Sequence, residues 1–62
     1  MTINTSAGRI NASESALNLI AIYAAEAAER YERDGCASLM KEADRIAREL
    51  HAALYDIGYY DF

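Results

Sequence analysis

Apolar residues in the first half of the chain recur with alternating spacings of three and four: Leu17, Ile20, Ala24, Ala27 and Tyr31. Residues with this spacing share one face of a helix, since positions three and four apart are neighbours on the helix surface. Ala21 and Ala28 widen this stripe. We therefore predict a helix over about residues 12–34, with one apolar face.

Capping residues indicate where this first helix begins and ends. Asn11 and Ser13 are both candidates for its start, and Asn11 has capping-box spacing with Glu14. Gly35 follows the helix in the segment "RDGC", and glycine favours the left-handed conformation that ends helices. We expect the chain to turn at Asp34-Gly35.

A second apolar stripe follows the turn, at new positions: Cys36, Met40, Ala43, Ala47, Leu50, Leu54 and Ile57. Continuing the first stripe through the turn would instead meet polar residues such as Ser38 and Arg45. The change of phase predicts a second helix over about residues 36–57. Because the connection is short, the two helices should be antiparallel neighbours.

Two helices leave part of each apolar stripe uncovered. Leu19, Ile22 and Tyr23 also lie on the otherwise polar side of the first helix. A symmetric dimer would cover such surfaces most simply, so we expect these three residues to form a dimer interface. The predicted fold is all-α, an antiparallel hairpin of two helices over residues 11–62 that dimerises into a four-helix bundle. Residues 1–10 are expected to be a flexible N-terminal segment, as a tail or as a strap across the bundle.

Composition narrows the choice of function. The chain has 62 residues, a net charge of −4, one cysteine and one histidine. An internal disulfide is excluded, and a Cys/His zinc site within one chain is disfavoured. The acidic balance argues against nucleic-acid binding, which depends on Lys and Arg contacts to phosphates. No apolar run is long enough for a membrane span and no signal peptide is evident, so we expect a cytoplasmic protein.

Catalytic and cofactor motifs are not evident. Cys36 begins the second apolar stripe, which favours a small core residue over a reactive thiol. His51 is the only imidazole, and it lies about 22 Å along the helix from Cys36, too far for a catalytic pair within one chain. The Glu-x-x-His spacing of di-metal bundles is missing, because Arg48 precedes His51 by three residues. We predict no enzyme activity, no cofactor and no metal.

The C-terminal segment "LYDIGYYDF" contains four of the six aromatic residues. Gly58 should end the second helix, and Tyr59 then occupies the position where a Schellman motif makes an apolar contact with Leu54. Aromatic residues are enriched at protein interfaces, and carboxylates beside them suit a basic partner. The predicted partner-binding residues, which are alternatively core residues, are Tyr55, Asp56, Tyr59, Tyr60, Asp61 and Phe62.

These patterns favour a non-enzymatic protein-interaction module that docks on a basic protein surface, as a regulator or inhibitor. One specific version is a phage or mobile-element inhibitor of a nucleic-acid machine, in the style of anti-CRISPR and anti-restriction proteins. The alternative is a dimeric helical hairpin that binds nucleic acid through basic residues near the turn: Arg30, Arg33, Lys41, Arg45 and Arg48.

Overall fold

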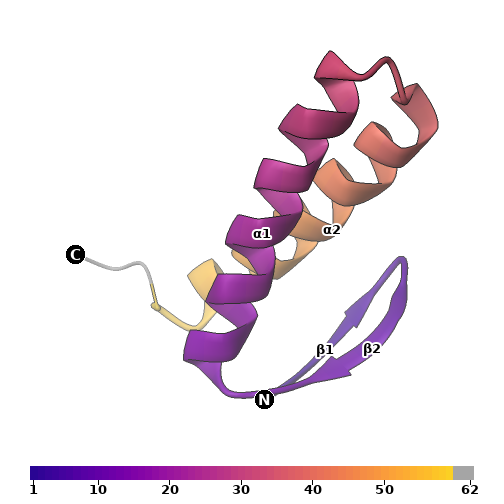
Figure 1. Ribbon diagram of the computed structural model, residues 1–62. Helices are drawn as coiled ribbons and strands as arrows, with labels where there is room; N and C mark the ends of the chain where they lie inside the picture. Colours follow the sequence, from indigo (N-terminus) through magenta and orange to yellow (C-terminus); the bar gives the residue numbers. More distant parts are fainter. Residues whose placement is uncertain (60–62) are drawn as a thin grey trace.

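The computed structural model describes residues 1–59, which form a β-hairpin followed by a helical hairpin (Figure 1). The elements are β1 (Thr2–Thr5), β2 (Gly8–Asn11), α1 (Glu14–Arg33) and α2 (Ala37–Asp56). The two helices pack along their length as antiparallel neighbours, as the change of phase predicted. The helical hairpin is therefore confirmed.

Ser13, not Asn11, caps the start of α1. The Ser13 hydroxyl accepts a hydrogen bond from the amide of Ala16 at 3.2 Å, which satisfies one of the free amides of the first turn. Asn11 is the last residue of β2 and pairs with Thr2. The capping-box alternative at Asn11 is wrong because the strand takes up that residue.

A glycine in the left-handed region ends α1. Gly35 has a φ of +76°, and its amide donates to the Glu32 carbonyl at 3.2 Å. The Cys36 amide donates to the Tyr31 carbonyl at 2.8 Å, which completes a Schellman motif. The Cys36 carbonyl then accepts from Met40 at 2.9 Å and starts α2. The predicted turn is confirmed at this position.

The same motif ends α2. Gly58 has a φ of +80°, its amide donates to the Tyr55 carbonyl at 3.0 Å, and the Tyr59 amide donates to the Leu54 carbonyl at 3.0 Å. Tyr59 is half-buried and packs against the core cluster that contains Leu54. Tyr59 thus covers the end of the helix, as its position relative to Gly58 predicted.

The structure contains a β-hairpin that was not predicted, so the fold is not all-α as expected. Its strands are antiparallel, with Ile3 opposite Ile10, so both apolar side chains share one face of the pair. Pairing continues beyond the strands, because Met1 and Ala12 exchange hydrogen bonds between their backbone groups at 3.0 and 3.1 Å. The hairpin lies against one side of the helix pair as a strap (Figure 1).

The core lies where the hairpin crosses the two helices. Its buried cluster is Ile3, Leu17, Ala21, Leu50 and Leu54. The contact line on α1 runs through Leu17, Ala21 and Ala28, one position away from the predicted line through Ile20. Ile20 and Ile57 were both expected to be in apolar stripes, but both are exposed. Rotation of α1 towards its alanines brings the helices close and turns Ile20 to solvent.

Candidate protein-docking surfaces

The predicted C-terminal docking residues divide between surface and core. Tyr55 is 68% exposed on the last turn of α2, and the neighbouring Asp56 is also exposed. Tyr59 contributes to the core instead of standing free. Tyr60, Asp61 and Phe62 lie outside the described residues. Of the described part of this cluster, Tyr55 and Asp56 therefore offer the accessible aromatic and acidic groups.

The predicted dimer patch lies on the side of α1 that faces away from α2. Leu19, Ile22 and Tyr23 are 49%, 40% and 62% exposed. Leu19 is about 200° around the helix from the buried Leu17, at 3.6 residues per turn. The three side chains are neighbours by their spacing of three and four. They form a small apolar patch on an otherwise charged surface.

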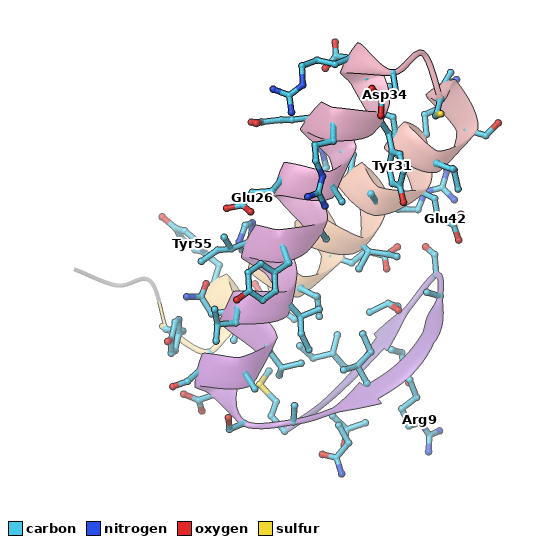
Figure 2. All side chains as sticks on the ribbon, viewed as in Figure 1. Arg9, Glu26, Tyr31, Asp34, Glu42 and Tyr55 are labelled. Carbon is cyan, nitrogen blue, oxygen red and sulfur yellow. The ribbon has the colours of Figure 1, made fainter. Side chains whose placement is uncertain are left out.

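A groove between the helices was not predicted. It has a volume of about 220 Å³ and is lined by Ala24, Ala27, Tyr31, Leu39, Glu42, Ala43 and Ile46. Figure 2 shows the labelled Tyr31 and Glu42 above the tip of the β-hairpin, on the same side of the helix pair, whereas Glu26 and Tyr55 lie on the other side. Ala24 and Ala27 contribute small side chains to this lining. In the folded chain they leave this groove open.

The tip of the β-hairpin is tied to α2 by one carboxylate. The Ser6 amide donates to Oε2 of Glu49 at 2.7 Å, and the Ser6 hydroxyl donates to Oε1 of the same residue. These two hydrogen bonds hold the pKa of Glu49 below its usual range. The bond from the Ser6 hydroxyl has the larger effect and the bond from the Ser6 amide the next largest. A smaller effect in the same direction comes from the Arg45 guanidinium. The carboxylate therefore stays ionised while it holds the strap.

Cys36 and His51 lie far apart, at positions within the helical hairpin where each is half-buried. Cys36 is half-buried and joins the two helices through its backbone hydrogen bonds. His51 is half-buried in the third quarter of α2, far along the helix from Cys36. Within residues 1–59, no group of three or more His, Cys, Asp or Glu side chains is arranged to hold a metal ion. Nor does any helix in this part of the chain have the length and apolar character needed to cross a bilayer.

Basic residues near the turn are mixed with acidic ones on the exposed sides of both helices. Arg48 pairs with Asp44 one turn earlier on α2, with 3.0 Å between Nε and Oδ2. The Arg48 side chain is largely exposed and that of Asp44 is half-exposed, so the pair contributes little to stability. Its consequence is that the positive charge of Arg48 is partly neutralised at the surface considered for nucleic acid.

The chain matches no protein-family model, and it has no significant similarity to a curated protein or to a solved structure.

Proposed function

We propose that this chain is a non-enzymatic protein-interaction module that completes its apolar core against another polypeptide. The observation that carries the proposal is the excess of exposed apolar side chains. Within residues 1–59, three large side chains are fully buried, Leu17, Leu50 and Leu54, whereas eight large apolar residues are exposed: Met1, Leu19, Ile20, Ile22, Tyr23, Leu39, Tyr55 and Ile57. Scattered exposed apolar residues are ordinary, but neighbouring ones mark interaction surfaces.

A homodimer is the proposed use of the patch formed by Leu19, Ile22 and Tyr23. The patch lies on one helix face and points away from the chain's own core. Two copies related by a twofold axis would place these patches against each other, so that four helices pack in the order α2, α1, α1, α2, a layered version of the predicted four-helix bundle. Ile22→Glu places a charge within the patch and should convert the dimer to monomers. Ala37→Glu, at an exposed position at the start of α2, serves as the control.

The accessible Tyr55 and Asp56 are the proposed contact with a basic protein partner. The aromatic ring provides buried area with little loss of conformational entropy, and the carboxylate favours encounter with cationic surfaces. A basic nucleic-acid-binding surface is the most specific candidate partner, and the chain would then act as an inhibitor of a nucleic-acid machine in the anti-CRISPR or anti-restriction style. The net charge of −4 supports this version.

The test compares proteins captured from source-cell lysate by wild-type protein and by variants, with quantitative mass spectrometry. A partner retained by wild type and by Asp44→Lys, but lost on Tyr55→Ala and on Asp56→Lys, supports the proposal. Circular dichroism should show that all the variants remain folded. Equal capture by all of them would contradict it. Retardation of RNA or DNA at low salt that Arg45→Glu abolishes would favour the nucleic-acid alternative instead.

A further inference from the structure

The groove and the surface beneath the β-hairpin are related by one heptad. The residues of α2 in the groove are Leu39, Glu42, Ala43 and Ile46. Seven positions later on α2 come Ile46, Glu49, Leu50 and Ala53. All four of these lie at the hairpin: Leu50 is in the buried cluster with Ile3, Ile46 and Ala53 pack against that cluster, and Glu49 binds Ser6.

The relation extends to α1. Seven positions before the groove residue Ala24 is Leu17, which belongs to the cluster beneath the hairpin. Because the helices are antiparallel, moving backward along α1 and forward along α2 both lead towards the hairpin. Seven residues of helix span about 10.5 Å. Four positions on α2 and one on α1 are therefore repeated at the groove, about 10.5 Å from the hairpin, with alanine at two places where the buried cluster has leucine. Ile46 belongs to both places.

The hairpin shows what the first of these two places, the helix surface around Leu50, binds. An extended strand inserts one branched apolar side chain, Ile3, between the helices. Three residues later, Ser6 donates its amide and its hydroxyl to the carboxylate of Glu49. The recognised chemistry is thus an extended segment that carries an aliphatic residue and, three positions on, a pair of hydrogen-bond donors.

The second place offers the matching groups. Glu42 lines the groove at the position equivalent to Glu49, and its carboxylate has no hydrogen-bond partner within residues 1–59. A volume of about 220 Å³ accepts one aliphatic or aromatic side chain, since a cavity of about 150 Å³ holds benzene. It is smaller than the roughly 300–1,000 Å³ typical of small-molecule sites.

We propose that the groove is a second seat for an extended segment, supplied by a partner protein, that resembles the chain's own β-hairpin. The segment inserts an aliphatic side chain between Ala24 and Ala43 and donates hydrogen bonds from a turn to Glu42. It lies end to end with the resident hairpin, because Ile46 is shared by the two places. The seat rests on the proposed function and deepens it, because it specifies the chemistry of one partner.

The probe is a backbone-cyclised peptide with the sequence of residues 1–12, labelled with fluorescein at position 9. Cyclisation is compatible with the fold because Met1 and Ala12 already pair through their backbones, and it is needed because isolated hairpins are marginal in water. Figure 2 shows Arg9 directed away from the helices, so a label there avoids the binding face. Fluorescence polarisation against the intact protein measures the affinity.

Binding should weaken about tenfold on Glu42→Gln, because hydrogen bonds to an ionised acceptor are among the stronger ones. Ala43→Arg should abolish it by filling the groove. Glu26→Gln, on the opposite side of the pair, should leave the affinity within about twofold of wild type. Replacing Ser6 of the peptide with alanine should cost as much as Glu42→Gln, and the two changes together no more than either alone.

Four results would overturn the proposal. One is the lack of any polarisation change at millimolar protein. A second is binding that is insensitive to Glu42→Gln and Ala43→Arg but lost on Glu49→Gln, since the peptide would then be replacing the resident hairpin. A third is preferential binding of a helical peptide that copies residues 14–33, because the groove would then accept a helix. The fourth is a homodimer that Ala43→Arg dissociates, because a second copy of the chain would then fill the groove. The lysate comparison at Tyr55 and Asp56 does not involve the groove, so the two proposals fail separately.

Discussion

Replacing Leu50 with alanine should test the position of the core most sharply. Leu50 is fully buried in the cluster that joins both helices to the hairpin, whereas Leu39, on the same helix, is 46% exposed at the groove. The same substitution at the two positions removes the same atoms from the same kind of helix. Any difference in stability therefore reports burial and not helix propensity.

The expected magnitude follows from the size of the domain. At about 0.05–0.15 kcal/mol per residue, a 62-residue chain has a free energy of unfolding of about 3–9 kcal/mol. Buried Leu→Ala changes cost about 2–5 kcal/mol, and we expect about 2–4 kcal/mol here because a thin core can partly collapse. Leu50→Ala should thus remove about a fifth of the stability or more. Leu39→Ala should stay within about 0.5 kcal/mol of wild type.

Urea denaturation followed by far-ultraviolet circular dichroism measures both variants. The slope of the free energy against urea concentration should be the same for wild type and Leu39→Ala, which confirms comparable surface exposure on unfolding. This position of the core would be refuted if Leu39→Ala were as destabilising as Leu50→Ala. It would also be refuted if Leu50→Ala were neutral.

Three further substitutions test the hairpin strap and the helix ends. The hydrogen bonds from Ser6 lower the pKa of Glu49 in the folded state, so the stability that they provide is fully present above the ordinary carboxyl pKa. This stability is lost as the pH falls through the lowered pKa of the folded state. Ser6→Ala should therefore make the midpoint of urea unfolding less dependent on pH between about pH 5 and pH 2. Gly35→Ala should cost about 1–2 kcal/mol in thermal unfolding, because the φ of +76° strains a side chain although the space beside it is open. Ser13→Ala should cost about 1 kcal/mol by losing the cap, whereas the exposed Ser15→Ala should be neutral or slightly stabilising by the same measurement.

The helical hairpin was predictable because its signals are local and repeated. The change of phase after Arg33, with Gly35 beside it, required a turn, and Gly58 followed by Tyr59 indicated the end of the second helix. These patterns draw on glycine conformation and on the helical repeat, which do not depend on distant parts of the chain.

The β-hairpin and the groove depend on tertiary contacts, and the sequence did not reveal them. Each strand has a single inward apolar residue, Ile3 or Ile10, which is too short an alternation to indicate a strand. The hairpin is stabilised by burying Ile3 against helices that come later in the chain. The groove exists because a short hairpin covers only part of the interhelical face, and hydrophobic periodicity says nothing about how far such a cover extends.

The most direct test of the central claim, that the exposed apolar surface is completed by another chain, is the absolute mass in solution across a dilution series. Light scattering after size exclusion should be combined with circular dichroism on the same samples. We expect a helical dimer near twice 6.9 kDa that Ile22→Glu converts to monomers. A fully helical monomer at every concentration, with neither its mass nor its melting temperature changed by Ile22→Glu, would contradict it.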